Sequence, residues 1–323
     1  MKTKYFDWFL RFLIISLTLI TCKKEDNTSL PIVKTYSPFY ISSTSVTLGF
    51  NVESDGGSTI TDCGIYIGTA QDPETSGTQL HIASDTGIFA GRIIRLLPST
   101  QYFYKAYAKN AKGEGLGEQV DFTTPGTITD YDNNVYETVK IGSQLWMAKN
   151  LRTTHYLNGD LIGTTSPLTL DISGESSPRY QWAYNGDENN VSAYGRLYTW
   201  YAVTDSRKVC PSGWHVSTDT EWTTLINYLG GGDVAGGKLK ETGTSHWQSP
   251  NAGATNESCF TALPGGTRSM DGTFYYIRES TYWWSSTEFN TNEAWARYNN
   301  IDDYVGRYQF NKLYGNSVRC VKD

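Results

Sequence analysis

Three segments in the first third of the chain alternate apolar and polar residues with a period of two. They cover residues 45–53, 62–69 and 101–110. This alternation is typical of β-strands that bury one face. Clusters of Gly, Ser, Asp and Pro separate the segments and disfavour a long helix between them. The pattern therefore predicts that residues 31–125 form a small β-sandwich.

The second half of the chain contains a segment with helical periodicity. Thr218 and Glu221 have the spacing of a capping box, in which a threonine and a glutamate satisfy the first free amides of a helix. The apolar positions that follow recur at i, i+3, i+4 and i+7, and are Trp222, Leu225, Ile226 and Leu229. This spacing predicts a helix with one buried face. The glycine-rich segment 230–238 is predicted to end the helix and continue as a loop.

A hairpin is predicted for residues 135–151, with its turn at Gly142. The preceding Asp130, Asp132 and Asn134 alternate as calcium ligands do, but the glycine and the distal glutamate of an EF-hand are missing. A polar turn is therefore the preferred interpretation. The four histidines lie far apart and no Cys-x-x-Cys spacing occurs, so the sequence predicts neither a metal site nor a cofactor.

Length and charge narrow the classes of function. The 323 residues are enough for about two domains. The formal net charge is −6 at pH 7, and no block of basic residues interrupts the sequence. Nucleic acid is therefore not an expected partner, because its phosphates are bound by clustered Lys and Arg.

The N-terminal residues are typical of an export signal. Basic residues precede an apolar run at 12–20, which is too short to span a bilayer. Cys22 follows Leu-Ile-Thr, which resembles the lipobox of bacterial lipoproteins, whose cysteine is diacylated. The sequence therefore predicts a signal peptide at 1–21, lipidation of Cys22 and a tether at 22–30. An ordinary secretory signal is the alternative.

The residues after Cys22 begin Lys-Lys-Glu-Asp. A lysine followed by acidic residues at this place resembles the surface-export signal of Bacteroidota lipoproteins. The resemblance implies an outer-membrane protein that is held by its lipid anchor and faces the cell exterior. The membrane is then a partner through the anchor. A plain solvated linker is the alternative interpretation.

Cysteine usage bears on whether the chain is a thiol enzyme. Cys210 lies five residues before His215, so one short segment contains a candidate nucleophile and a candidate base. Exported proteins enter an oxidising environment, however, where cysteines form disulfides. Cys210 and Cys320 lie on either side of the segment that contains the predicted helix. We therefore predict a disulfide between Cys210 and Cys320, with His215 in a structural role. Pairing of either cysteine with Cys259 is the competing arrangement, and Cys63 is predicted to be a buried thiol.

The segment LLPSTQYFYKAYAKNAKGEG (96–115) resembles the fibronectin type III signature. The matching positions are Leu96, Pro98, Thr100, Tyr102, Ala106, Ala108, Asn110 and Gly113. The resemblance implies that the Tyr102 hydroxyl bonds back to the backbone at a corner of the sandwich. It also implies that residues 31–125 mainly space and present another domain, with a binding role of their own as the alternative.

Seven separated motifs in residues 129–323 occur in the order of one domain family. They are VKIGSQLWMAKNL, AYGRLYTWYAV, CPSGWHVSTDTEWTTL, FTALPGGTRSMDGTF, YWWSSTE, AWARY and GNSVRCVKD. On these motifs, residues 129–323 resemble the Fibrobacter succinogenes major paralogous domain, which is common on Bacteroidota surface lipoproteins. The resemblance implies an extracellular domain whose activity is undefined.

A further resemblance concerns the fold. The Thr-x-x-Glu-Trp helix, the glycine-rich middle, the Trp-Ser-Ser run and the closing Val-Arg-Cys strand are similar to the C-type-lectin-like fold. The predicted fold class is therefore multidomain, with an all-β fibronectin type III-like sandwich at 31–125 and an α+β C-type-lectin-like domain at 129–323. Formylglycine-generating enzymes share this fold, but Cys259 and Cys320 lack the arrangement of their two cysteines. No enzyme and no catalytic residue is predicted.

In lectin-like folds the long loops carry ligands, which here implies residues 243–272 and 286–312. Side chains in and beside these segments combine aromatic faces with amides and carboxylates, which suits sugars or peptides. They are His246, Trp247, Asn251, Arg268, Asp271, Tyr275, Glu288, Asn290, Trp295, Arg297, Tyr298, Asn299 and Asp302.

Arg268, Trp295 and Arg297 are the predicted ligand-binding residues, because interface anchors are enriched in Trp and Arg. The alternative is that they stabilise the domain, Trp295 by packing and the arginines by pairing with Asp302 or Asp303. The sequence thus predicts a cell-surface lipoprotein that binds an extracellular glycan or protein, or mediates attachment. A structural display module and an uncharacterised enzyme on a formylglycine-generating-enzyme-like fold are the alternatives.

Overall fold

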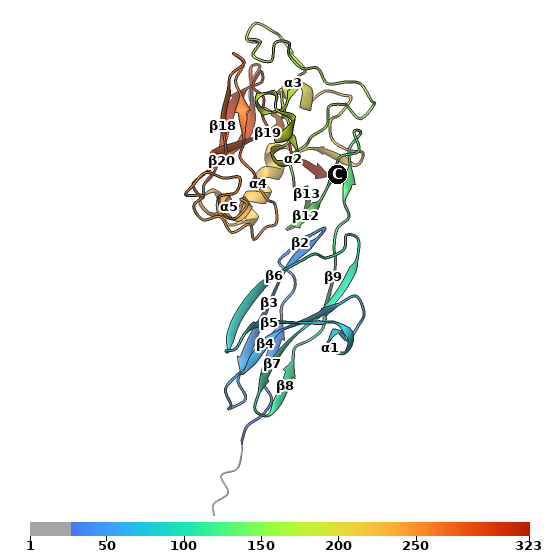
Figure 1. Cartoon of the computed structure of the whole chain (residues 1–323), viewed down its shortest axis with the longest axis vertical. Helices are drawn as coiled ribbons and strands as arrows, with labels where there is room; N and C mark the ends of the chain where they lie inside the picture. Colours follow the sequence, from blue (N-terminus) through green and yellow to red (C-terminus); the bar gives the residue numbers. More distant parts are fainter. Residues whose placement is uncertain (1–26) are drawn as a thin grey trace, which may run out of the picture.

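The computed structural model describes residues 27–323, and the predicted signal peptide and Cys22 lie outside this range. Figure 1 shows an elongated molecule with two units along its longest axis, an N-terminal unit of strands and a C-terminal unit of strands and short helices. No helix within residues 27–323 has the length and apolar character needed to cross a bilayer. The described chain is mostly β-structure.

The N-terminal unit is a sandwich of two sheets, as the period-two pattern predicts. One sheet contains β1 (Ile32–Thr35), β2 (Tyr40–Ser42), β3 (Ser45–Ser54) and β6 (Gly87–Ile94). The other contains β4 (Asp62–Gly68), β5 (Thr78–Ala83), β7 (Gln101–Asn110), β8 (Gly113–Leu116) and β9 (Val120–Thr123), and a one-turn helix, α1 (Pro73–Ser76), connects β4 to β5. Apolar side chains of β3 and β7 meet in the core between the sheets, and each buried one stabilises the fold by about 1.5–3 kcal/mol.

Two predictions within the sandwich are confirmed. The backbone N–H of Leu97 donates to the Tyr102 hydroxyl at 3.0 Å, which is the predicted tyrosine corner. The ring of Tyr102 stacks on Phe122 with 5.6 Å between centroids. Cys63 is a fully buried free thiol in the same core.

One eight-stranded sheet runs through both units. Its order is β1, β3, β2, β12 (Thr138–Ile141), β13 (Gln144–Met147), β22 (Cys320–Lys322) and β16 (Trp214–Val216), with β6 beside β3. β12 and β13 form the predicted hairpin, and Gly142 in its turn has a φ of 59°, which glycine adopts readily. The pairing of β12 with β2 joins the C-terminal unit to the N-terminal unit.

Buried contacts reinforce this junction. Ser43 Oγ donates to Gly126 O at 2.9 Å, and the N–H of Thr138 donates to Ser43 Oγ at 2.8 Å. The ring of Tyr40 on β2 meets the ring of Tyr228 edge to face at 6.4 Å. The two units therefore share a sheet and a packed interface, whereas a domain boundary commonly falls in a flexible linker.

The C-terminal unit has a second sheet of five strands. Its order is β18 (Phe274–Ile277), β17 (Gly265–Arg268), β19 (Ser280–Glu288), β20 (Glu293–Asn300) and β21 (Val305–Asn311). The helices α4 (Asp219–Tyr228) and α5 (Gly232–Leu239) pack on one face of it. Trp222 of α4 lies 5.4 Å, ring to ring, from Trp283 of β19. The predicted capping box of α4 is present, and its apolar face is buried as predicted.

The prediction of a loop at 230–238 is wrong, because α5 begins at Gly232. Two glycines inside this helix lie where other backbone approaches closely. A Cβ on Gly236 would lie 2.1 Å from Asp303 O, and one on Gly237 would lie 2.2 Å from Gly253 O. Packing therefore requires glycine here in spite of its low helix propensity.

Short elements and irregular segments complete the C-terminal unit. The elements are β10 (Ile128–Thr129), β11 (Val135–Tyr136), β14 (Gln181–Trp182), two 3-10 turns (Tyr184–Gly186 and Glu188–Asn190), α2 (Val191–Tyr194), β15 (Leu197–Tyr198) and α3 (Trp200–Val203). Irregular backbone inside a protein needs hydrogen-bond partners, because an unpaired buried carbonyl is costly. Long polar side chains supply several of them.

Arg319 is the clearest example, with a side chain that is 1% exposed. Its Nε donates to Asn150 Oδ1 at 2.7 Å. Nη1 donates to the carbonyls of Met147 at 2.8 Å and Phe260 at 3.0 Å, and Nη2 donates to Thr261 O at 3.1 Å. Burial lowers the pKa of this guanidinium below its ordinary value. The planar donor fork thus connects β13 to an irregular segment that has no strand of its own.

Candidate functional site

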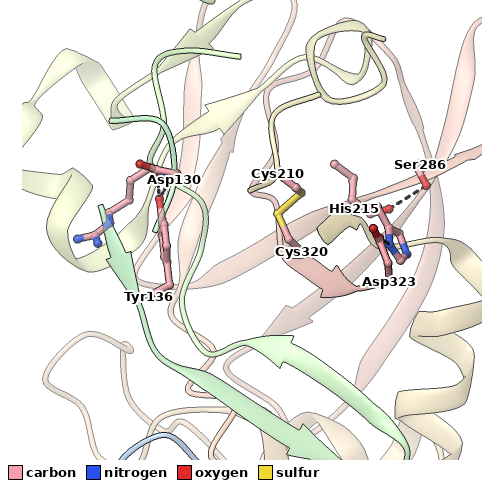
Figure 2. Close-up of a disulfide and its surroundings, with 9 residues drawn as sticks. Asp130, Tyr136, Cys210, His215, Ser286, Cys320 and Asp323 are labelled. Carbon is pink, nitrogen blue, oxygen red and sulfur yellow. Dashed lines mark hydrogen bonds and ion pairs between the residues drawn. A yellow bond between two sulfur atoms is a disulfide. The ribbon is translucent and has the colours of Figure 1, made fainter. Parts of the chain in front are cut away.

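The structure joins Cys210 to Cys320 by a disulfide, the pair that the sequence favoured (Figure 2). Both cysteines are buried, and Cys320 on β22 is in register with Val216 on β16. Cys259 is a buried free thiol that accepts a hydrogen bond from Ser45 Oγ at 3.4 Å, so the competing pairing is wrong. A disulfide sulfur is not a thiolate, and Cys210 therefore cannot act as the nucleophile of a thiol enzyme.

His215 lies beside this disulfide and bonds two carboxylates, of which Figure 2 shows that of Asp323. Its Nδ1 lies 2.7 Å from Asp323 Oδ1, and its Nε2 lies 2.8 Å from Glu221 Oε1. Burial alone would lower the pKa of His215, but the hydrogen bonds to Asp323 and Glu221 outweigh burial and raise it. Glu221 also belongs to the capping box of α4. His215 therefore has the structural role that the sequence predicts.

The structure does not support the predicted ligand-binding role of Arg268, whose side chain is fully buried. Its Nη1 donates to Ser269 O at 3.1 Å, and its Nη2 donates to Leu168 O at 3.0 Å and to Leu170 O at 2.7 Å. The guanidinium carbon lies 4.2 Å from the centroid of a Trp182 ring. Burial lowers the pKa of Arg268. This arginine holds an irregular segment against β17.

Arg297 is buried as well, at 1% exposure, so its ligand-binding prediction is corrected in the same way. Its Nη1 lies 2.5 Å from Asp219 Oδ1, and its Nη2 donates to Thr223 Oγ1 at 2.9 Å. Arg297 therefore connects β20 to the first turn of α4. Its carboxylate partner is Asp219, and the predicted pairing with Asp302 or Asp303 is wrong.

Trp295 is partly exposed on the same face of β20. One face of its ring is covered by Arg307, whose guanidinium carbon lies 3.3 Å from the ring centroid. The edge of Phe289 approaches it at 4.8 Å between centroids. Arg307 is itself paired with Asp219 at 2.8 Å. Ligand binding by Trp295 stays a prediction, and the visible role of the ring is packing against an arginine.

The opposite face of the five-stranded sheet carries a groove lined by aromatic rings. We call it the aromatic groove, and its lining residues are Tyr282 on β19, Tyr298 on β20, and Tyr308 and Phe310 on β21. It is an open depression of about 290 Å³. Tyr282 and Tyr298 are in register with 5.0 Å between ring centroids, and Tyr308 lies 5.7 Å from Tyr298. Because the rings pack on one another, the groove is formed without a ligand.

Further tyrosine rings lie between the groove and β18. Tyr276 lies 6.3 Å from Tyr282, and Tyr275 lies 5.7 Å from Tyr276, ring to ring. We call Tyr275, Tyr276, Tyr282, Tyr298 and Tyr308 the tyrosine row. Tyr276 is 50% exposed and has a φ of 65°, a conformation that costs a bulky residue of the order of 1–3 kcal/mol and that is enriched at functional sites.

The groove is uncharged. Among residues 27–323, no Lys, Arg, Asp or Glu lines it. Burial and the neighbouring phenol of Tyr298 raise the pKa of Tyr282, so its hydroxyl stays protonated at neutral pH. Gly306 leaves room for the rings above it, since a Cβ there would lie 2.4 Å from the ring of Tyr308 and 2.8 Å from that of Tyr304. The groove thus offers apolar ring faces and neutral hydroxyl groups.

Two other cavities contain polar groups that are already paired. In the cavity beside the disulfide, which is about 290 Å³, His215 bonds two carboxylates and Ser286 Oγ donates to a backbone carbonyl at 3.0 Å. The second cavity is about 420 Å³ and is lined by both charges. There Arg196 lies 2.5 Å from Glu188, and Asp132 accepts from Thr154 at 2.5 Å. The charged groups of the second cavity and His215 of the first are therefore already engaged within the protein.

The structure also places the acidic residues that alternate before the hairpin. Asp130 Oδ1 accepts the backbone N–H groups of Asp132 and Asn134, both at 2.9 Å, which confirms a polar turn. Asp132 Oδ1 lies 2.5 Å from His155 Nδ1. Within the described range 27–323, no three His, Cys, Asp or Glu residues are grouped as metal ligands.

Sequence reasoning found only part of the aromatic groove. Tyr275 and Tyr298 were in the candidate set, and the residues it missed are Tyr276, Tyr282, Tyr308 and Phe310. The segment 286–312 was expected to be a loop, but most of it forms β20 and β21. Aromatic residues spaced two apart, as in Tyr308-x-Phe310, were the available signal, because such residues share one face of a strand.

Comparison with known proteins identifies one family for the chain. The sequence profile of the Fibrobacter succinogenes major domain matches residues 139–322. A search of curated proteins finds no match.

Among solved structures, the sensor domain of the anti-sigma factor RsgI4 of Pseudobacteroides cellulosolvens is 19% identical, with a TM-score of 0.25, over 30% of this chain and 97% of that chain. Domains A168–A170 of titin are 25% identical, with a TM-score of 0.22, over 31% of this chain and 33% of that chain. The third fibronectin III domain of human KIAA0343 is 20% identical, with a TM-score of 0.22, over 31% of this chain and 88% of that chain.

Proposed function

The chain belongs to the Fibrobacter succinogenes major domain family, and we propose that it is a non-catalytic cell-surface protein that binds an extracellular ligand through the aromatic groove. The observation that carries this proposal is the groove itself. Its rings are packed and in place, and Tyr308 is 44% exposed at its rim. Exposed aromatic surface of this kind is typical of interaction sites, and tyrosine offers a large rigid ring with a hydroxyl at its end.

The arrangement of the sheet supports this choice of face. The helices α4 and α5 cover one side of β19, β20 and β21, and the buried Arg297 fixes that side to Asp219. The other side bears the groove, but only part of it is uncovered, because Trp284, Ala294 and Ala296 on that side are buried in a hydrophobic core. The uncovered part is left to solvent or to a partner.

We propose that the protein is a lipoprotein of a Bacteroidota outer membrane, anchored at Cys22 and facing the cell exterior. The N-terminal sandwich then spaces the groove from the anchor, which agrees with the elongated shape in Figure 1. In the native host, Cys22→Ala should release the protein from the membrane fraction, because two acyl chains supply stable anchoring. Processed Cys22→Ala protein that stays in the membrane would contradict the anchor, and full protection from protease added to intact cells would contradict the outward orientation.

We also propose that the C-terminal unit is a C-type-lectin-like domain. The capped α4, the irregular segments and the Arg319-containing end of the sheet are the features that support it. An enzyme of the formylglycine-generating kind is disfavoured, because it would need two cooperating thiols. Cys320 is bonded to Cys210, and Cys259 is buried at the junction of the two units.

An array of glycans and extracellular matrix proteins, probed with the purified protein, tests the binding function. Tyr308→Thr removes a ring from the groove while keeping a residue suited to a strand. Tyr131→Thr is the matched control, because Tyr131 is 51% exposed and lies outside the groove. We expect Tyr308→Thr to lower the affinity for every ligand found by at least about tenfold, or about 1.4 kcal/mol. Tyr131→Thr should bind with the wild-type affinity, and both variants should have the wild-type Tm. If Tyr308→Thr binds as tightly as the wild type, the binding site is not the aromatic groove, and if no ligand is found, the display-module alternative is favoured.

A further inference from the structure

We propose that the ligand of the aromatic groove is a neutral, linear carbohydrate chain that lies along the tyrosine row from β18 to β21. This inference rests on the proposed function and specifies its ligand. It is argued from the length of the row, the chemistry of its side chains and the charges around it.

The row is longer than one sugar ring needs. Successive ring centroids from Tyr275 to Tyr308 are separated by 5.7, 6.3, 5.0 and 5.7 Å. Tyr282, Tyr298 and Tyr308 lie on the successive strands β19, β20 and β21, and their intervals are close to the spacing between neighbouring strands, about 4.8 Å. A single sugar would cover one or two of these rings. Because Tyr282 is only 8% exposed, a chain of pyranose units would contact mainly the exposed Tyr275, Tyr276 and Tyr308 and the partly exposed Tyr298.

The side chains of the row match the surface of a sugar. An aromatic face is electron-rich and contacts C–H groups, which form the flat faces of a pyranose. The phenol groups supply donors and acceptors for the hydroxyls at the edge of the sugar ring. Tyr308 is 44% exposed, so its phenol is accessible to such a partner at the rim of the groove.

A peptide fits the same surface less well. An extended peptide binds a sheet mainly by adding a strand at a free edge. The centre of the groove lies on β19 and β20, and each of these strands is already paired on both sides. β21 is an edge strand, but a peptide added there would extend the sheet beside Tyr308 and Phe310 and would not lie along the tyrosine row. A proline-rich peptide, which docks on aromatic rings without strand pairing, is therefore the peptide that the experiment has to include.

The charges favour an uncharged chain. The groove has no ionised lining residue within the described residues. Asp302 and Asp303 lie in the turn between β20 and β21, and the whole chain carries a formal charge of −6. Arg307 lies on the opposite face of the sheet, where it is held between Trp295 and Asp219. Arg278, two residues beyond Tyr276, is exposed, but its Nη1 and Nη2 already donate to the backbone carbonyls of Ser245 and Thr244. The lining of the groove itself supplies no cation that would bind an acidic polysaccharide.

Calorimetric titration of the purified protein with defined oligosaccharides tests the inference. The probes are neutral hexasaccharides of glucose, mannose and xylose, the matching disaccharides, a hexamer of galacturonate and a decamer of proline. Tyr276→Gly removes the exposed ring near the β18 end, and glycine accepts the positive φ at this position. Tyr308→Thr removes the ring at the other end, and Tyr131→Thr is the control.

We expect at least one neutral hexasaccharide to bind at least tenfold more tightly than its disaccharide, and the galacturonate hexamer and polyproline not to bind. Tyr276→Gly should lower the affinity for the hexasaccharide to that for the disaccharide and leave the disaccharide affinity unchanged. Tyr308→Thr should lower the affinities for the hexasaccharide and for the disaccharide. Tighter binding of galacturonate or polyproline, or a hexasaccharide affinity that Tyr276→Gly does not change, would overturn the inference. If only protein ligands on the array depend on Tyr308, the carbohydrate is wrong and the binding function stands. If no ligand depends on Tyr308, both proposals fail.

Discussion

Replacing Arg319 with methionine should lower the free energy of unfolding by about 3 kcal/mol. Methionine keeps much of the length and apolar stem of the side chain but donates no hydrogen bond. The three backbone carbonyls that Arg319 bonds would lose this donor, at about 1–3 kcal/mol for each buried acceptor. Asn150 Oδ1 keeps a partner, because Trp283 Nε1 donates to it at 2.9 Å. Folding of the wild type removes the Arg319 cation from water, and folding of the variant does not. This difference offsets several kcal/mol of the loss, which leaves a net decrease of about 3 kcal/mol in the free energy of unfolding.

Urea unfolding followed by tryptophan fluorescence measures this change. Apart from Trp8, the tryptophans of the chain lie between Trp146 and Trp295, so the signal reports the C-terminal unit. Arg307→Met is the control, because the side chain of Arg307 is 47% exposed and its ion pair is expected to contribute less than about 1 kcal/mol. If Arg319→Met unfolded at the wild-type urea midpoint with the same slope, the buried hydrogen bonds would not stabilise the unit and our reasoning would be refuted.

Three further predictions follow from the contacts described above. Replacing both Cys210 and Cys320 with alanine should lower stability by about 4.8 kcal/mol, from the chain-entropy relation for a sequence separation of 110 residues, and unchanged urea curves would contradict that estimate. The raised pKa of His215 stabilises the fold below the ordinary pKa of about 6.5, and this contribution is lost as pH rises through the raised value. His215→Gln should therefore flatten the dependence of Tm on pH, and two parallel Tm curves would contradict the role of the histidine. In a solvent-exposed helix, Gly236→Ala would stabilise the fold by about 1 kcal/mol. Here it should lower Tm, because the added Cβ would clash with the backbone carbonyl of Asp303. A higher Tm would exclude that clash.

Features that depend on nearby residues were predictable from the sequence. The alternation in residues 45–53 predicted β3, because a strand buries every second side chain whatever its partner is. Thr218 and Glu221 predicted the start of α4, because a capping box closes within three residues. The sequence does not predict the helix α5, because its glycines look like helix-ending residues. They are required by the close approach of the backbone at Gly253 and Asp303, which are distant in the sequence.

The candidate site was harder to predict, because burial depends on which face of the sheet the helices cover. Arg268 and Arg297 carry a donor fork that suits a ligand, a backbone carbonyl or a carboxylate equally well. Only the folded structure shows that both forks are directed inward. Tyr282 and Trp283 are neighbours in the sequence, and one lines the groove while the other lies in the core against α4. Nothing local distinguishes the open face from the covered one.

The pairing of β2 with β12 affects how several copies would act together. A flexible linker between the units would let each groove sample many orientations relative to its own N-terminal sandwich. The shared sheet removes that freedom, since hydrogen bonds across the junction set the angle between the units. Copies whose sandwiches are held in one orientation would therefore present their grooves at a common angle. Simultaneous engagement raises avidity only where the geometry allows it, so multivalent attachment should depend on the spacing and direction of the chains in the target and not on their density alone.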